Sequence, residues 1–267
     1  PGWHIECSAM SIKYLGKKFE IHGGGRDLIF PHHENEIAQS ESFTKEQFAK
    51  IWMHAGMITI NGEKMSKSVG NVKSINHVIE SWGPNVARLF CISGHYSKPI
   101  DYTEDLLREN LIRLRQIETC YYELRLAEQQ GESENISSLL EESRIKFDKA
   151  LNDDFNTPLG LTIFFNMVKM INSFAAAEKI TKDMSEQALP VLEYMLEVLG
   201  IKIQTVTDDE IKSVFDLINK RETFRVEKQF EEADKIREQI SGLGISLIDH
   251  KNKTLWMKKE SIKAEKL

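Results

Sequence analysis

The stretch FEIHGGGRDLIFPHHENE, residues 19–36, sets the expectation for the fold of this chain. Phe19 to Ile21 alternates like the end of a strand, and the three glycines that follow permit backbone angles and close approaches that a β-carbon prevents. Pro31 suits the first turn of a helix that runs through Glu36. A strand that passes through glycines into a helix is typical of a nucleotide-binding crevice at the carboxyl edge of a parallel sheet.

The same stretch carries residues that can bind a metal ion. On a helix His32 and Glu36 lie four residues apart, so both can face one ion. We assign Cys7 as the third donor, because thiolate, imidazole and carboxylate are all zinc ligands and three protein ligands leave one position open for substrate. His33 competes with His32, since it lies three residues from Glu36. The HExxH pattern of metalloproteases does not occur here.

The residues before this stretch predict half of a β-α-β unit. Trp3, Ile5 and Cys7 alternate as in a strand, and residues 8–16 follow as a crossover helix before the strand at residues 18–21. The chain starts without methionine and enters this element at once. We therefore expect it to be the C-terminal part of a longer protein.

A second motif, KMSKS, occupies residues 64–68. It contains Lys64 and Lys67, and Gly62 and Gly70 bracket it. This arrangement lets a flexible basic segment close over a polyphosphate. The motif differs from GxxxxGK[ST], so it does not imply a P-loop.

Composition narrows the class of protein. With 267 residues, 41% apolar and 28% charged, the chain is long enough for two or more cores and is ordinary for a soluble globular protein. Its net charge of −6 argues against a bulk basic nucleic-acid binder. Residues 250–267, however, hold six lysines against two glutamates, which gives +4. Such a basic tail can still meet a phosphate backbone.

The three cysteines are few and widely spaced, which favours a reducing compartment and a cytoplasmic location. No apolar run approaches membrane-spanning length and no signal peptide opens the chain, so we expect no membrane association. Cys91 and His95 lie close in sequence without a further ligand nearby. We predict a packed cysteine and a surface histidine there.

Apolar residues at helical spacing predict that the rest of the chain is mostly helical. Thr157 and Pro158 look like a cap and a first-turn proline, and Gly200 looks like a C-terminal stop. After short helices within residues 72–102, the predicted helices are 107–124, 137–151, 158–178, 185–199, 208–225 and 231–241, followed by a hairpin of 245–249 and 254–258.

The segment HGGGRDLIFPHHENEIAQSE, with KMSKS at this distance after it and GWHIECSAM ahead of it, resembles the second half of the catalytic domain of class I cysteinyl-tRNA synthetases. The resemblance covers the chain closely to about Thr103 and more loosely beyond. The family's first half, with its HIGH sequence and another zinc-ligand cysteine, does not appear in this sequence.

The resemblance implies an α/β Rossmann-like catalytic half-domain, followed by a mostly α-helical bundle and a small α+β C-terminal module. Residues 1–60 would form the second half of the catalytic domain with its zinc site, and 61–104 the KMSKS loop and connecting domain. Residues 105–206 would form the helical bundle, which in the family spans the inside of the tRNA L. Residues 207–267 would form the anticodon-binding module.

The activity implied is ATP-dependent ligation of L-cysteine to tRNA(Cys) through cysteinyl-adenylate, with Zn²⁺ selecting the substrate thiolate and Mg²⁺ accompanying ATP. Lys67 would contact the phosphates, with Lys64 as the loop's other catalytic lysine. Cys7, His32 and Glu36 would hold zinc together with the family's other cysteine. The residues implied for ATP and the amino acid are Gly23, Gly24 and Gly25 beside adenosine, Asp27 on the ribose hydroxyls, His22 orienting the site and Trp3 walling the cysteine pocket.

Residues 225–256, RVEKQFEEADKIREQISGLGISLIDHKNKTLW, resemble the family's anticodon-binding module. By match to it, Arg225, Asp234 and Asp249 would hydrogen-bond anticodon bases, and Phe230 would stack where many relatives have tryptophan. Without the resemblance, these residues indicate a solvated helical face with a packed phenylalanine.

Two other functions stay open. One is a cysteine ligase that passes the adenylate to a small amine, although such relatives lack the module at residues 225–256. The other is a non-catalytic tRNA-binding fragment or paralogue. The expected partners are tRNA(Cys), L-cysteine, ATP and the missing N-terminal half of the same protein, with a monomer when complete.

Overall fold

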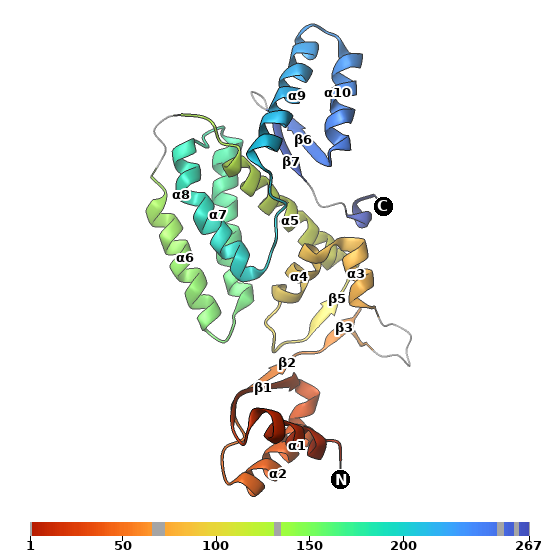
Figure 1. Cartoon of the computed structure of the whole chain (residues 1–267), viewed down its shortest axis with the longest axis vertical. Coiled ribbons are helices and arrows are strands. Elements are labelled where there is room, and N and C mark those ends of the chain that lie inside the picture. The colour runs from red at the N-terminus through yellow and green to blue at the C-terminus, as the bar shows by residue number, and fades with distance from the viewer. Residues whose placement is uncertain (1, 66–72, 131–134, 250–253, 259–261, 267) are drawn as a thin grey trace. The chain divides into compact units, whose positions relative to one another are not determined.

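The computed structural model describes residues 2–65, 73–130, 135–249, 254–258 and 262–266 (Figure 1). The chain divides into two compact units. Unit 1 comprises residues 1–72 and 91–104, and unit 2 comprises residues 73–90 and 105–267. The finer division into four parts stays a prediction.

Unit 1 begins with a helix, α1 (His4–Leu15), where the sequence predicted a strand. The strand prediction was wrong because the alternation over residues 3–7 involves only three side chains. Ile5, Ser8 and Ile12 recur instead at helical spacing. Ser8 is buried, and Ile12 packs against the small apolar cluster of the unit.

A β-α-β unit is present, one element later than predicted. Its strands β1 (Phe19–Gly25) and β2 (Ala49–Ala55) pair in parallel, with Phe19 opposite Ala49. Pro31 lies in a π-helical turn that ends at His33, ahead of the α-helix rather than in its first turn. The connection consists of the 3₁₀ turn η1 (Arg26–Leu28), the π-helical turn η2 (Ile29–His33) and α2 (Glu34–Thr44).

A second small sheet in unit 1 contains the first residue of the KMSKS motif, Lys64. Its central strand β3 (Ile58–Ile60) pairs antiparallel with β4 (Glu63–Lys64) and parallel with β5 (Ile100–Tyr102). One carboxylate oxygen of Asp101 accepts hydrogen bonds from Thr59 Oγ1 at 2.6 Å and from the backbone N–H of Gly62 at 2.8 Å. Asp101 therefore fixes the turn from which the motif starts.

Unit 2 is built of helices, as the sequence predicted. The helix α5 has Leu107, Leu114 and Ile117 fully buried, and α6 packs on α7 and α8. Gly200 ends α8 in the left-handed conformation, with φ of 67°, which confirms the predicted stop. The helices are α3 (Ile75–Trp82), α4 (Pro84–Ser93, its last three residues in unit 1), α5 (Glu104–Arg125), α6 (Ser137–Asn152), α7 (Thr157–Ala176) and α8 (Lys182–Leu199).

The cap of α7 is Asn156 rather than the predicted Thr157. The Asn156 side-chain oxygen accepts a hydrogen bond from the backbone N–H of Leu159 at 3.1 Å, which places Thr157 inside the helix. Asparagine caps at least as well as threonine, so the position one residue earlier takes the role. Pro158 keeps its predicted place in the first turn.

The helix α7 is also long and apolar enough to cross a membrane, with a mean hydropathy of 1.3. This corrects the expectation that no apolar run approaches such a length. Leu161, Phe164 and Ile171 are buried inside unit 2, and α7 packs on α6. Core helices satisfy the same test of length and composition, and a single such helix is weak evidence for a membrane span.

The last elements of unit 2 follow the predicted pattern closely. Figure 1 shows α9 (Asp208–Val226) and α10 (Phe230–Gly242) as a helical hairpin beside the strands. The predicted β-hairpin is present as β6 (Ile245–Asp249) paired antiparallel with β7 (Thr254–Lys258). A 3₁₀ turn, η3 (Lys263–Lys266), packs on α3. Of the basic tail, residues 254–258 and 262–266 are described.

Cys91 and His95 do not behave as predicted. Cys91 is exposed, because its neighbours Leu89 and Phe90 take the buried side of α4. His95 is half-buried, and its Nδ1 lies 2.8 Å from Ser97 Oγ. Cys120 is the buried cysteine of the chain.

Candidate functional site

Three potential metal ligands converge in unit 1. Cys7 comes from α1, His32 from the π-helical turn and Glu36 from α2, and their ligand atoms lie within 4.8 Å of one another. The helices α1 and α2 pack together, which brings a cysteine near two residues that follow it by more than twenty positions. Glu36 is only 1% exposed. The predicted set of donors is thus assembled around a buried carboxylate.

The atom Nε2 of His32 has two close partners. The indole N–H of Trp3 donates to it at 2.6 Å, so Nε2 carries a lone pair and no hydrogen. The same atom lies 2.7 Å from Oε1 of Glu36, which is also an acceptor when ionised. Two acceptors at this distance require a proton or a cation between them.

The second carboxylate oxygen of Glu36 faces His22. His22 Nε2 lies 3.0 Å from Oε2 of Glu36, yet within the described part of the chain this buried oxygen has no aligned hydrogen-bond donor. A buried polar atom left in this way is costly in a folded protein. The position of this oxygen fits a site that binds a further group.

Burial sets the protonation of these donors. It raises the pKa of Glu36 to about 7, and it raises the pKa of Cys7, with the Glu36 charge adding to the effect. Burial also lowers the pKa of His32, assisted by the neighbouring His4. A neutral imidazole can bind a divalent cation directly. A thiol, and a carboxyl group with a pKa near 7, can bind it once the cation displaces their protons. The set of one sulfur, one nitrogen and one oxygen suits zinc.

His33, the competing histidine, belongs to a second group. His22, His33 and Glu36 also bring ligand atoms within 4.8 Å of one another, while Cys7 is grouped with His32. His33 Nδ1 lies 2.8 Å from His54 Nε2. Burial, with His22 and His54 nearby, lowers the pKa of His33 to about 4, so this ring is neutral.

Sequence reasoning did not assign His54 or Trp52 to the site. The parallel register puts Trp52 opposite His22 and His54 opposite Gly24, and the rings of Trp52 and His22 lie 4.6 Å apart between centroids. The only available signal was that β2 leads back towards the glycine stretch. The register of β1 and β2 determines which residues lie opposite each other, and it could not be predicted from the sequence.

Packing explains why glycine occupies positions 24 and 25 of β1. A β-carbon on Gly24 would lie 2.7 Å from the imidazole of His33, and one on Gly25 would collide with the carboxylate of Asp27. Gly23 would meet only the carbonyl of Met53 at 3.5 Å. The close approach predicted for this stretch is thus made by side chains of the chain itself. The role of these glycines and Asp27 beside adenosine stays a prediction.

The KMSKS residues are only partly described. The backbone of Lys64 pairs with Thr59 in the sheet of β3 and β4. The side chain of Lys64 and the whole of residues 66–72, with Lys67, lie outside the described residues. Their predicted contact with phosphates is untested.

The predicted anticodon residues lie on the last elements of unit 2. Arg225, in the last turn of α9, is exposed and contacts Glu222 at 3.2 Å. Phe230 begins α10 with 61% of its surface exposed, so the alternative of a packed phenylalanine is wrong. Asp234 is exposed four residues further along the same helix, and Asp249 ends β6 with its side chain outside the described residues.

Comparison with known proteins shows which protein families the chain resembles. Residues 1–111 match the family described as tRNA synthetases class I (C) catalytic domain, and residues 146–204 match the DALR domain. A solved LeuRS–tRNA–LeuAMS ternary complex from Agrobacterium radiobacter K84 is similar in fold over 68% of this chain and 27% of that chain, with a TM-score of 0.50 and 15% identity. Two separate segments of the chain thus match a class I tRNA synthetase catalytic domain and a DALR domain.

The particular relatives are curated cysteine–tRNA ligases. Those of Caldicellulosiruptor saccharolyticus and Thermodesulfovibrio yellowstonii are 41% and 40% identical to this chain over 93% and 96% of its length. The chain spans 55% and 57% of the length of these two proteins. The resemblance to cysteinyl-tRNA synthetases is confirmed.

Proposed function

We propose that this chain contributes the zinc-binding part of the amino-acid site and the tRNA-binding part of a cysteine–tRNA ligase. The reaction is ATP-dependent ligation of L-cysteine to tRNA(Cys) through cysteinyl-adenylate. The convergence of Cys7, His32 and Glu36 inside the class I (C) catalytic segment is the observation that carries the proposal. The names of relatives about 40% identical support it.

Cys7, His32 and Glu36 would hold the zinc ion. Two observations support this assignment: His32 and Glu36 face each other as acceptors, and the second carboxylate oxygen of Glu36 has no aligned hydrogen-bond donor in the described part of the chain. When bound, zinc stabilises the thiolate of the substrate, whereas the hydroxyl of serine is a far weaker ligand and much harder to ionise. Shape alone separates such near-isosteres poorly, so this chemistry supplies the selectivity.

The other residues of the site position the substrates. Trp3, beside His32, would wall the cysteine pocket, and His22 would orient the bound groups. The glycines at 23–25 and Asp27 would contact ATP, with Lys64 and Lys67 on its phosphates and Mg²⁺ bound to the nucleotide. The cysteine carboxylate attacks the α-phosphate in line and pyrophosphate leaves, so the protein mainly aligns groups and neutralises charge.

The catalytic segment is proposed to be half of a Rossmann-like domain that works with further polypeptide. Ile21 of β1 lies opposite Ile51 of β2, and both are more than half exposed. Parallel strands are normally covered on both faces. We infer that polypeptide equivalent to the rest of the relatives' length covers this sheet, in a cytoplasmic enzyme.

The tRNA side of the function falls on unit 2. The bundle would span the inside of the tRNA L, and the module of α9, α10, β6 and β7 would contact the anticodon. The exposure of Arg225, Phe230 and Asp234 supports this, because anticodon bases are read by accessible polar and aromatic side chains.

The test is cysteine-dependent exchange of pyrophosphate into ATP, with metal analysis, on this chain alone and mixed with the complementary part of a curated relative. Exchange in the mixture, with zinc near one ion per chain and rejection of serine, is the expected result. Binding of tRNA(Cys) without exchange in the mixture would favour a non-catalytic tRNA-binding protein. Exchange without any tRNA binding would favour a ligase that acts on a small amine.

A further inference from the structure

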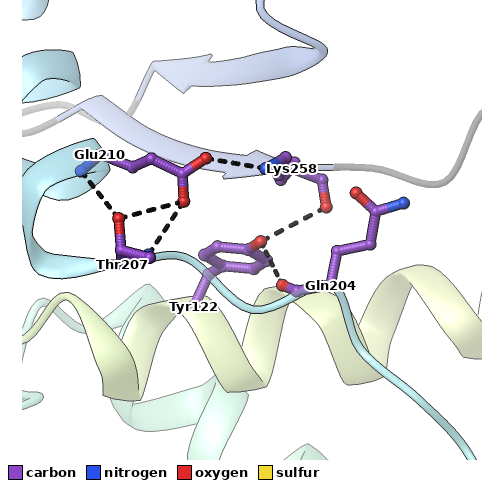
Figure 2. A network of polar contacts seen from close by, with 5 residues as sticks. All are labelled: Tyr122, Gln204, Thr207, Glu210 and Lys258. Carbon is purple, nitrogen blue, oxygen red and sulfur yellow. Dashed lines mark hydrogen bonds and ion pairs between the residues drawn. The ribbon is translucent and has the colours of Figure 1, made fainter.

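The C-terminal module, defined here as residues 207–258, meets the bundle helix α5 at one buried side chain. The hydroxyl of Tyr122 donates a hydrogen bond to the carbonyl of Gln204 at 2.7 Å, and the carbonyl of Lys258 lies 3.4 Å from it (Figure 2). Tyr122 is fully buried. Gln204 lies in the linker before α9, and Lys258 ends β7. The Tyr122 hydroxyl therefore contacts the linker just before the module and also the last residue of the module.

The two ends of the module are also tied to each other. Lys258 Nζ contacts Oε1 of Glu210 at 2.8 Å, and Oε2 of Glu210 accepts a hydrogen bond from the backbone N–H of Thr207 at 2.9 Å (Figure 2). Thr207 Oγ1 in turn accepts from the N–H of Glu210, which completes a capping box at the start of α9. The start and the end of the module are thus bonded to each other, on the side of the module that contacts α5.

Packing at this base is incomplete. Trp256 of β7 is fully buried with its ring centroid 6.0 Å from that of Tyr122, but its indole N–H has no hydrogen-bond partner in the described part of the chain. A cavity of about 220 Å³ lies beside it, lined among others by Leu126 and Phe215. Space that no protein atom fills adds no packing contacts that would hold the hairpin in one place. The hydrogen bonds of Tyr122 therefore carry more of the orientation.

The linker, residues 200–206, is fixed at a second point. The Asn85 side chain on α4 donates to the carbonyl of Lys202 at 2.9 Å and accepts from its N–H at 3.0 Å. Asn85 holds the linker two residues before Gln204. The end of α5 also meets the module, through an ion pair of Arg125 Nη2 with the exposed Asp208 Oδ1 at 2.8 Å. Tyr122 adds buried hydrogen bonds to the linker at Gln204 and to the module at Lys258.

We propose that Tyr122 is a positioning residue that fixes the direction of the C-terminal module relative to the bundle, so that both contact one tRNA at once. This inference rests on the proposed function of unit 2. When two linked surfaces bind one ligand, the second contact gains from an effective concentration that falls as their relative orientation loosens. Loss of the Tyr122 hydroxyl removes the donor to the Gln204 carbonyl and the longer contact with the Lys258 carbonyl, and so loosens that orientation.

The test compares two RNAs on wild-type chain and Tyr122→Phe, by equilibrium binding at fixed salt. Full-length tRNA(Cys) spans the bundle and the module, and we expect its dissociation constant to rise about five- to tenfold, the worth of one good hydrogen bond. The isolated anticodon stem-loop contacts the module alone. Its affinity should stay within about twofold of wild type, because it requires no relative orientation.

Tyr121→Phe is the matched control. Tyr121 is the preceding residue and is 5% exposed, and in the described part of the chain its hydroxyl makes no hydrogen bond. Its removal should leave both affinities unchanged. Equal weakening of both RNAs by Tyr122→Phe would indicate a damaged module and overturn the positioning role, as would no weakening of either. Failure of the wild-type chain to bind either RNA would overturn the proposed function itself, and this inference with it.

Discussion

At His32 the indole N–H of Trp3 and the proposed zinc ion would compete for one nitrogen atom. The indole N–H of Trp3 occupies the lone pair of Nε2, the atom that faces Glu36. A zinc ion bound at Nε2 needs that lone pair, so we expect zinc to release the Trp3 indole. Zinc titration should change tryptophan emission in the wild-type chain, whereas Trp3→Phe should bind zinc with no such change. An identical response in Trp3→Phe would show that the ion binds elsewhere.

The assignment of Cys7 is tested by its thiol. Cys7→Ser replaces a soft ligand with a poor one, so we expect the zinc content of the purified chain to fall below about half of the wild-type level. Atomic absorption measures this directly. Cys91→Ser is the control, because Cys91 is exposed and lies outside both groups of possible ligands found in the described residues. Unchanged zinc in Cys7→Ser refutes the assignment.

The pH dependence of zinc binding follows from Glu36. Its pKa is raised to about 7, so the carboxyl is mostly protonated below that pH and must lose its proton to bind the ion. Zinc affinity should therefore rise with pH, by about tenfold per unit for each proton displaced. Competition with a chelator between about pH 6 and about pH 8, roughly one unit either side of this pKa, would measure it. Glu36→Gln should bind more weakly and show a slope smaller by about one proton; an unchanged slope would exclude Glu36.

The candidate ligands were predictable because donor chemistry and helical spacing are both written in the sequence. His32 and Glu36 needed only a helix-like turn, and Cys7 needed only the packing of its element nearby. The bond from Trp3 to His32 and the rings of His54 and Trp52 were not predictable. They depend on the register of β1 and β2 and on the path of α1, which no local pattern specifies.

At the scale of elements, the sequence was most informative where caps and periodicity agree. The hairpin of β6 and β7 lies at its predicted residues. The helix α9 is one residue longer than predicted at its C-terminal end, and α10 is one residue longer at each end. The N-terminal strand was wrong because three alternating residues cannot distinguish a strand from a helix, whereas the contacts of Ser8 and Ile12 with the rest of the unit can.

The capping box of α9 gives a prediction about stability. Thr207→Ala removes the side-chain acceptor for the N–H of Glu210, and we expect it to destabilise the helix start by about 1 kcal/mol. Hydrogen exchange at the first turn of α9 should report it, with faster exchange there than in α5. Thr223→Ala, in the exposed last third of the same helix, should not destabilise it, because alanine has the higher helix propensity. Equal effects of the two changes would show that the cap contributes nothing.

At the scale of the whole molecule, unit 1 has apolar side chains that its own helices and strands leave exposed. The pair of Ile21 and Ile51 is open, and a groove of about 330 Å³ lies between α1 and α2. The sequence led us to expect further polypeptide, but not to expect which surface it would cover. The position of the apolar surface depends on tertiary packing, so it could not be read in advance.

Phe43 tests whether this surface binds the rest of a catalytic domain. It lines the groove with Ile5 and Ile12, and 77% of its surface is exposed. Phe43→Ser should leave the chain folded, since an exposed ring contributes little to the free energy of unfolding. Burial of a phenylalanine ring stabilises an interface by about 1.5–3 kcal/mol, so its loss should weaken binding of the complementary part of a relative about tenfold or more. Sedimentation of the mixture would measure this affinity.

Leu139→Ser supplies the comparison, because Leu139 is 48% exposed on α6 in unit 2 and far in sequence from the groove. We expect it to leave the association unchanged. Equal affinities for Phe43→Ser and the wild-type chain would place the contact elsewhere on unit 1, with the open sheet of Ile21 and Ile51 as the next surface to mutate. Equal weakening by both substitutions would indicate a loss of solubility rather than of an interface, because the two residues belong to different units.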